Sequence, residues 1–220
     1  MEIRGYEIEP RADLANAYLS GLNLSGADMT GANLSNADLI EVILENAKLS
    51  GANLTGANLY GANLRGANLT GANLRGANLA HADLGQVWPH EPTKLSYADL
   101  TDTNLTYADL TESWLTGANL TGANLSHANL TDVNLSGANL SHANLTGTRL
   151  VDADLTDANL SGTDLSVAVM EVVERKSDSE IAAERFHRKY MEGSRSSFVS
   201  SDPNSLLNSY SHDEIEEKFW

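Results

Sequence analysis

Residues 51–79 have the sequence GANLTGANLYGANLRGANLTGANLRGANL, in which a five-residue motif repeats with few changes. Outward from this stretch, an apolar residue recurs every five positions from Leu14 to Leu84 and again from Leu95 to Leu165. Each run holds fifteen units, and the consensus unit is Ala-(Asn/Asp)-Leu-(Ser/Thr)-Gly. Alanine stands two positions before the central residue in 22 units, and Asn or Asp stands one position before it in 24. Any fold of this chain must accommodate that period.

A period of five fits neither regular secondary structure. An α-helix turns about 100° per residue, so a step of five rotates the central residue by roughly 140° and spreads the leucines over every face. A flat strand alternates its faces, so successive leucines would lie on opposite sides. The leucines gather on one side only if the chain bends once per unit. Glycine and Asn or Asp suit that bend, and alanine beside leucine indicates a narrow interior.

Units such as Gly51-Ala52-Asn53-Leu54-Thr55 resemble the pentapeptide-repeat family, and the resemblance covers about residues 12–170. It implies an all-β solenoid, namely a right-handed quadrilateral β-helix with four units per coil. The central leucine and the preceding alanine would then point inward, and the other three positions outward. Thirty units would form about 7.5 coils, or roughly 36 Å of rod at the usual spacing of neighbouring strands.

The repeat is interrupted once, because Leu84 and Leu95 are eleven positions apart. Six residues, 87–92, are left over between the flanking units. Two prolines among them favour a loop at one corner of the rod, and the alternative is a degenerate unit with a one-residue bulge. Irregular loops on regular scaffolds often carry function. The candidate partner contacts in this loop are Trp88, Pro89 and His90, unless Trp88 packs back onto the rod.

Several outward positions break the polar consensus with large side chains. Ile40 and Tyr60 are twenty residues apart, so on a four-sided coil one lies above the other. Tyr18 falls on the same side, and Trp114 replaces the usual Asn in a later unit. Large apolar patches mark interfaces, whereas scattered single residues need no explanation. We take Tyr18, Ile40, Tyr60 and Trp114 as candidate partner contacts.

The two ends of the chain depart from the repeat. Residues 1–11 are expected to cap the start of the rod, because an open coil exposes core leucines and unpaired strand edges. Residues 171–192 are predicted to form a C-terminal α-helix that caps the rod or pairs with a second copy. The serine-rich stretch 193–220 is predicted to be a tail. Its last residues, Phe219 and Trp220, are candidate contacts of a docking-like segment, and a disordered tail is the alternative.

The composition limits the classes of partner and compartment. The 220 residues carry a formal net charge of −16, which argues against direct binding to nucleic acid or anionic membrane. No run of about 18 apolar residues is present, so no membrane-spanning segment is expected. The N-terminus lacks the apolar core of a signal peptide, so a cytoplasmic protein is expected. The absence of cysteine excludes disulfides and thiolate metal sites.

No pattern in the sequence points to catalysis. The six histidines fall in separate units or irregular segments, and no zinc-protease motif, nucleophile elbow or phosphate-binding loop is present. Neighbouring carboxylates such as Asp152 and Asp154 are interpreted as solvated surface. We therefore expect no catalytic, cofactor-binding or metal-binding residues, no cofactor, and no enzymatic activity.

Three hypotheses of function remain. The first is a non-enzymatic interaction scaffold that presents a rigid acidic rod to a protein partner, with homodimer formation through the C-terminal helix or tail as a further hypothesis. The second follows from a distant resemblance to Qnr-type family members, which implies a DNA mimic that binds DNA gyrase or topoisomerase and protects it from inhibitors. The third is a structural component of a phage or multiprotein assembly.

Charge density weakens the second hypothesis. Residues 11–170 contain 16 acidic and 6 basic side chains, a net of −10. Duplex DNA of the same length would carry roughly 20 negative charges, about twice as many. Qnr-type members also tend to place Phe at central positions, where this chain has none. The corner loop and the predicted C-terminal helix keep the hypothesis open.

Overall fold

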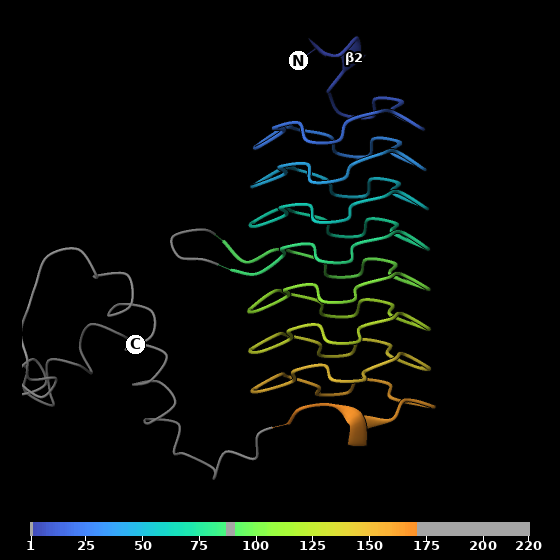
Figure 1. Cartoon of the computed structure of the whole chain (residues 1–220), viewed down its shortest axis with the longest axis vertical. Helices are drawn as coiled ribbons and strands as arrows, with labels where there is room; N and C mark the ends of the chain where they lie inside the picture. The colour runs from blue at the N-terminus through green and yellow to red at the C-terminus, as the bar shows by residue number, and fades with distance from the viewer. Residues whose placement is uncertain (1, 87–90, 171–220) are drawn as a thin grey trace, which may run out of the picture. The chain divides into compact units, whose positions relative to one another are not determined.

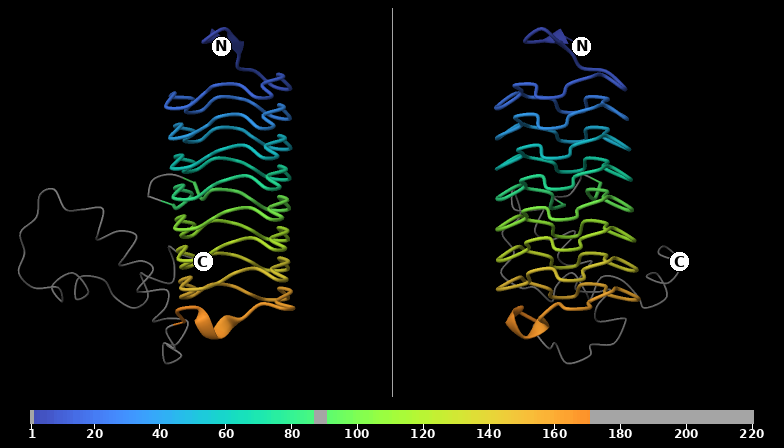
Figure 2. Two further views of the ribbon diagram at one scale, coloured as in Figure 1. Left: turned by 45° about the vertical axis from the view of Figure 1, so that its right-hand side comes forward. Right: turned by 90° about the vertical axis from the view of Figure 1, so that its right-hand side faces the viewer.

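The computed structural model describes residues 2–86 and 91–170 (Figure 1). The chain divides into two units, Met1–Val172 and Val173–Trp220, and every described residue belongs to the first. In that unit the chain winds into similar coils stacked along one axis, with the N-terminal residues at one end of the stack (Figures 1 and 2). The predicted helix within 171–192 and the tail 193–220 lie outside the described residues.

Few stretches of the described chain form named elements. Strands β1 (Glu2–Ile3) and β2 (Tyr6–Glu7) form an antiparallel hairpin ahead of the first coil. Its two turn residues, Arg4 and Gly5, both have positive φ (55° and 79°), as a two-residue type I′ turn requires. A single turn of 3₁₀ helix, η1 (Leu165–Val167), lies in the last coil, ahead of Val169, which bridges Arg149.

Parallel bridges between successive coils build the solenoid. Asn33 bridges Asp13 on one side and Asn53 on the other, so the partners are twenty residues apart. Four five-residue units therefore form one coil, which confirms the β-solenoid with four units per coil that the family resemblance implied. The bridges are isolated rather than joined into long strands, because two of the five residues in each unit form the corner turn.

Each corner is closed by a main-chain hydrogen bond. The Ala17 amide donates to the Leu14 carbonyl at 3.1 Å across the two corner residues. The second of these, Asn16, has a φ of 57°, and Gly56 in an equivalent slot has 65°. Positive φ at the third residue of a four-residue turn is typical of type II turns and favours glycine. The consensus glycine is explained by this slot.

The core is a narrow column of leucine and alanine. Every central residue from Leu14 to Leu150 is at most 4% exposed, and the alanines two positions earlier are buried beside them in most units. Burial of a leucine contributes roughly 1.5–3 kcal/mol before chain entropy is counted. Where a hydroxyl residue replaces the alanine it is hydrogen-bonded: Thr103 donates from Oγ1 to the Leu74 carbonyl at 3.0 Å.

One coil is longer than the others. Asn68 bridges Lys94, a separation of 26 residues, so this coil contains six residues more than its neighbours. The extra residues leave the coil at the corner between Leu84 and Leu95. At the described end of the insertion, buried Thr93 accepts a hydrogen bond from the Gly66 amide and donates one to the Leu64 carbonyl, each at 3.1 Å. This hydroxyl fixes the returning chain to the preceding coil.

Candidate protein-interaction surface

Outward side chains form columns along the stack, because each coil repeats the register of the previous one. The next residue in a column lies twenty positions later, or 26 positions later across the insertion. The corner that follows Leu19 and its equivalents differs from the polar consensus. Its glycine slot is occupied, coil by coil, by Gly21, Glu41, Gly61, His81, Tyr107, His127 and Gly147.

Four rings contact one another along this corner. The centroids of His81 and Tyr107 are 5.1 Å apart with planes within 7°, and those of Tyr107 and His127 are 4.9 Å apart with planes within 12°. Tyr60 lies against His81 at 5.3 Å, tilted by 58°. We define the aromatic ridge as Tyr18, Ile40, Tyr60, His81, Tyr107 and His127. It runs along one corner from the first coil to the sixth.

The rings of the ridge are exposed, and three of the residues that carry them have an unfavourable backbone conformation. Tyr107 is 56% exposed and both histidines are exposed. His81, Tyr107 and His127 have φ values of 58°, 57° and 60°, a region that costs side-chain-bearing residues about 1–2 kcal/mol each relative to ordinary conformations. Ring stacking contributes roughly 0.5–1.5 kcal/mol per pair and offsets part of that cost.

Inspection of the sequence missed this stack for a definable reason. No two histidines lie one coil apart, so the histidines alone show no stack. Tyr107 separates His81 from His127, and the step from His81 to Tyr107 is 26 residues rather than twenty because it crosses the insertion. The signal was present, but it is visible only when the columns are counted with the six extra residues removed.

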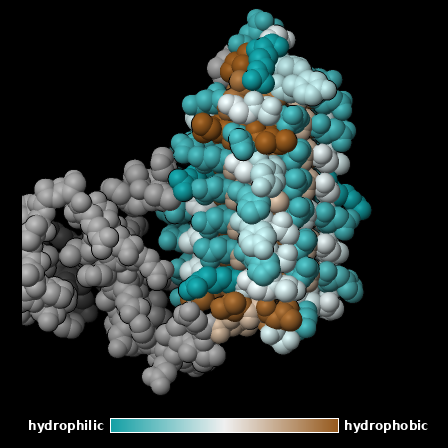
Figure 3. Space-filling model, viewed as in Figure 1, coloured by the Kyte–Doolittle hydropathy of each residue, from teal (hydrophilic) through white to brown (hydrophobic). Residues whose placement is uncertain are grey.

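The candidate contacts at the start of the ridge lie near one another. Tyr18 is 70% exposed and Tyr60 is 42% exposed, whereas Ile40 is partly buried one coil before Tyr60. Ile43, in the next unit after Ile40, is also partly exposed. Figure 3 shows strongly hydrophobic residues near the N-terminal end and around the last coil, with hydrophilic and intermediate residues between them. Their role as partner contacts stays a prediction.

Trp114 belongs to a different side of the coil. Its ring is 44% exposed and lies above the Lys94 side chain, with Nζ 5.6 Å from the ring centroid. Lys94 also approaches Glu91 at the end of the insertion, at 3.9 Å. Tyr97, 70% exposed, lies over Gly117 at the corner diagonally opposite the ridge. These residues form a second, smaller group of exposed rings next to the insertion.

The remaining candidate contacts cannot be placed. Trp88, Pro89 and His90 in the insertion lie outside the described residues, as do Phe219 and Trp220 at the end of the chain. Each stays a prediction from the sequence.

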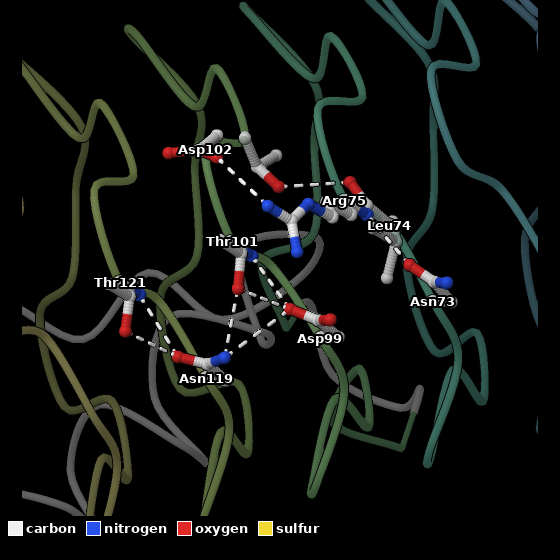
Figure 4. Close-up of polar contacts among 9 residues, drawn as sticks. Asn73, Leu74, Arg75, Asp99, Thr101, Asp102, Asn119 and Thr121 are labelled. Carbon is white, nitrogen blue, oxygen red and sulfur yellow. Dashed lines mark hydrogen bonds and ion pairs between the residues drawn. The ribbon is translucent and has the colours of Figure 1, made fainter.

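Elsewhere the outward polar side chains bond to one another (Figure 4). The Asp99 carboxylate accepts hydrogen bonds from the Thr101 amide and hydroxyl. Asn119, one coil later, donates from Nδ2 to the Thr101 hydroxyl at 2.9 Å and accepts from Thr121. These side chains direct their polar atoms toward the rod, which explains the preference for Asn or Asp followed by Ser or Thr.

Most cations of the described coils are paired with carboxylates. The ion pairs are Lys48–Asp28 at 3.4 Å, Arg65–Asp83 at 2.6 Å, Arg75–Asp102 at 3.8 Å and Lys94–Glu91 at 3.9 Å. Arg75 and Asp102 are drawn in Figure 4. Because the acidic side chains outnumber the basic ones, carboxylates dominate the charged surface of the coils.

Hydrogen bonds from turn residues favour the ionised form of three carboxylates. The side-chain hydroxyl and then the main-chain amide of Thr30 lower the pKa of Asp28. Thr156 lowers the pKa of Asp154 and Ser166 lowers that of Asp164 through the same two bonds. These shifts follow from the local Asx turn and indicate no catalytic pair.

Within residues 2–86 and 91–170, no group of three or more His, Asp or Glu side chains is arranged to hold a metal ion. In the same part of the chain, no helix has the length and apolar character needed to cross a membrane.

A family model described as pentapeptide repeats matches residues 11–46, 47–86, 93–122 and 134–171, in eight copies. The gap between the second and third of these segments coincides with the six-residue insertion. No curated protein matches the sequence.

Several solved structures are similar. HetL, a pentapeptide repeat protein involved in heterocyst differentiation regulation in Nostoc sp. strain PCC 7120, is 35% identical, with 76% of this chain and 85% of HetL covered and a TM-score of 0.28. A pentapeptide repeat protein from the Arabidopsis thaliana thylakoid lumen is 28% identical, with 63% and 72% covered and a TM-score of 0.30. QnrB1, a plasmid-mediated fluoroquinolone resistance protein, is 19% identical, with 74% and 86% covered and a TM-score of 0.35.

Proposed function

Because the chain belongs to the pentapeptide repeat family, we propose that it is a non-enzymatic scaffold that binds a protein partner through its aromatic ridge. The observation that carries this proposal is the exposed ring stack of Tyr60, His81, Tyr107 and His127. Three of these residues occupy slots where glycine would remove backbone strain. A role at an interface gives a reason for rings at these positions.

The physical properties of the ridge suit protein recognition. Tyrosine and other aromatic residues are enriched at the energetically important positions of interfaces. The coils beneath the ridge are tied by repeated main-chain hydrogen bonds, so little ordering is needed when a partner binds, and binding loses less entropy. The acidic coils favour a partner whose contacting surface is basic.

A matched pair of variants tests the proposal. Tyr107→Gly removes a ridge ring, and Tyr97→Gly removes an exposed ring from the same kind of slot on the diagonally opposite corner. Both changes introduce the consensus residue, so both variants are expected to fold. The intact chain and each variant are immobilised, exposed to extract of the source organism, and the retained proteins are compared by mass spectrometry.

We expect a partner that the parent and Tyr97→Gly retain and that Tyr107→Gly loses. Retention by all three proteins would place the partner surface elsewhere on the chain and contradict the role of the ridge. Loss from Tyr97→Gly alone would instead assign binding to the group of rings that includes Trp114.

The DNA-mimic hypothesis predicts a different result. The pairing of four cations with carboxylates leaves the coils with an excess of unpaired negative charge, as a mimic needs. Under this hypothesis the intact chain inhibits supercoiling by DNA gyrase at micromolar concentration, and salt weakens the inhibition. Unchanged supercoiling would reject gyrase as the partner while leaving the scaffold proposal intact. Homodimer formation through 171–192 or 193–220 stays a prediction that light scattering can test.

A further inference from the structure

The N-terminal end of the aromatic ridge carries large side chains at four outward positions that are polar in the consensus. These are Tyr18, Ile40, Ile43 and Tyr60, which we call the N-terminal patch. They belong to the first three coils and to neighbouring columns around one corner. Tyr18 and Tyr60 are exposed, and both isoleucines are partly exposed.

Two of these residues give up a hydrogen bond that the repeat normally makes. In the next coil after Ile43, Asn63 accepts from the Arg65 amide at 3.2 Å through its side-chain oxygen. Tyr18 and Ile43 occupy the same slot of their units but have no acceptor at that position. Neither gains full burial in exchange, and Tyr18 is 70% exposed. These residues weaken the local turn without strengthening the core, which points to a contact outside the coil.

Carboxylates surround the patch. Asp38 bridges Tyr18 from the next coil of the same column, and Glu41 follows Ile40 at the corner. The Glu41 side chain extends toward the slot of Gly61, adjacent to Tyr60. Glu45 completes the group, and its carboxylate accepts a hydrogen bond from the Asn63 side-chain Nδ2 at 2.9 Å.

Within the described coils, no cation forms an ion pair with these three carboxylates. Lys48, the cation of the same coil, pairs with Asp28 on another side. The Arg4 guanidinium donates to the main-chain carbonyls of Tyr18 and Ser20. The N-terminal patch therefore combines exposed tyrosine rings with carboxylates that no described cation pairs with; Glu41 is exposed, and Asp38 also accepts a hydrogen bond from the Ile40 amide at 3.2 Å.

Building on the proposed function, we infer that the N-terminal patch binds an arginine-bearing segment of the partner protein. A guanidinium group stacks on a tyrosine face and forms paired hydrogen bonds with a carboxylate, and the patch places both groups side by side. Leucine or similar side chains of the segment would cover Ile40 and Ile43. Lysine makes weaker use of such a site, because its ammonium group neither stacks as a plane nor forms bidentate bonds.

A labelled synthetic peptide, GSRLRLRSG, serves as the probe, and its binding to the full chain is measured by fluorescence anisotropy. Its comparison peptides are GSKLKLKSG, which has the same charge, and GSELELESG, which has the opposite charge. We expect binding in the order arginine, lysine and glutamate, with the last undetectable at about 1 mM peptide. Equal binding of the arginine and lysine peptides would overturn the assignment to guanidinium recognition.

Ring removal tests the geometry of the site. Tyr18→Asn with Tyr60→Thr restores the consensus at both positions, and we expect affinity for the arginine peptide to fall at least about tenfold. Tyr97→Gly, which removes an exposed ring elsewhere, is expected to leave affinity unchanged. Circular dichroism and melting temperature confirm that each variant is folded. Unchanged affinity in the Tyr18/Tyr60 variant would refute the site.

Charge removal separates local recognition from general attraction to an acidic protein. One variant removes three carboxylates at the patch, Asp38→Asn, Glu41→Gly and Glu45→Thr. The other removes three at the far end, Asp152→Gly, Asp154→Asn and Asp157→Gly. We expect the first to reduce affinity at least about tenfold and the second less than about twofold in about 150 mM salt, where distant charges are screened. Equal losses would overturn the inference.

The two proposals fail in different ways. Partner capture that depends on Tyr107, without binding of the arginine peptide at the patch, would reject this inference and leave the scaffold role standing. Capture that is independent of Tyr107, together with arginine-specific binding at the patch, would reject the ring stack around Tyr107 as the partner surface and support the patch as an arginine site.

Discussion

At the scale of single residues, the glycine slot decides what a corner can carry. The slot needs positive φ, and sixteen non-glycine residues in the described chain adopt positive φ, most of them at corners. Side chains in the slot lie over the equivalent slot one coil later: the rings of His127 and His142 occupy the space above Gly147 and Gly162. A ring is therefore accommodated where the next coil offers either glycine or another ring.

Tyr107 allows the strain of this slot to be separated from the stacking. Tyr107→Ala keeps the positive φ and loses both ring contacts, so we expect destabilisation of about 1–2 kcal/mol. Tyr107→Gly loses the same contacts but relieves about 1–2 kcal/mol of backbone strain, so its stability should stay close to that of the parent. Urea unfolding followed by circular dichroism measures both. An alanine variant as stable as the parent would show that the stack contributes nothing, and an alanine variant as stable as the glycine variant would show that the slot imposes no strain.

The turn carboxylates predict a dependence on pH. The hydrogen bonds from Thr156 and Ser166 lower the pKa of Asp154 and Asp164, so the folded state favours the ionised form. Their contribution is present above the ordinary value of 3.8 and is lost as the pH falls through the lowered folded values. Asparagine accepts the same hydrogen bonds at every pH. The double variant Asp154→Asn/Asp164→Asn should therefore lose less melting temperature than the parent between pH 6 and pH 3.

Asp152→Asn is the control for this comparison, because Asp152 lies in a glycine slot and its side chain forms no hydrogen bond within the described coils. Its melting temperature should follow that of the parent across the same pH range. A constant difference between the double variant and the parent would show that the turn bonds are insensitive to ionisation.

At the scale of the coil, the repeat predicted most of the architecture. A central Leu every five residues and an Ala two positions earlier predicted one bend per unit and a narrow aliphatic interior, whereas four units per coil followed from the resemblance to the pentapeptide-repeat family. Only the N-terminal part of the aromatic ridge was predicted from the sequence. Ile40 and Tyr60 were identified from a spacing of twenty, and Tyr18 because it falls on the same side, but the continuation through His81 and Tyr107 depends on the longer coil.

The hydrogen bonds of Thr93 were not predictable from the repeat. At other corners the amide of the glycine slot donates to a main-chain carbonyl one coil later, as Gly56 does to Arg75. At the insertion the chain leaves the coil, and the Thr93 hydroxyl takes the place of that carbonyl for Gly66. Sequence alone shows a threonine in an alanine slot, which occurs elsewhere without this role.

Thr93→Ala tests whether the Thr93 hydroxyl is needed as the acceptor that replaces a main-chain carbonyl for the Gly66 amide. We expect destabilisation of about 1–3 kcal/mol, because the Gly66 amide loses its acceptor at a partly buried junction. Thr103→Ala is the matched control: it also restores the consensus alanine and removes one donated bond, but leaves no amide without a partner, so its effect should be smaller. Chemical unfolding of both variants gives the comparison. Equal losses would mean that the hydroxyl is dispensable at the junction.

At the scale of the whole molecule, the excess of negative charge is expected to oppose folding. The four ion pairs are partly or largely exposed, and exposed pairs contribute about 0–1 kcal/mol each. Repulsion among the remaining carboxylates acts along the full stack. Because the acidic residues of 11–170 outnumber the basic ones by ten, we expect repulsion to outweigh pairing.

Salt therefore should stabilise the protein. Raising sodium chloride from about 10 mM to about 500 mM shortens the Debye length from about 30 Å to less than about 5 Å, which screens repulsion between coils. We expect the melting temperature to rise over this range. Potassium chloride should act equally, since screening depends on ionic strength. A fall in melting temperature would show that the ion pairs outweigh the repulsion.

The constant register of the bridges also makes the described chain a molecular ruler. A residue twenty positions later lies in the same column one coil further along, at the usual strand spacing of roughly 4.8 Å. Across the longer coil the step is 26 residues. Spin labels at outward positions can thus be set at graduated separations by arithmetic on the sequence. Their measured distances would report whether the stack stays straight when a partner is bound.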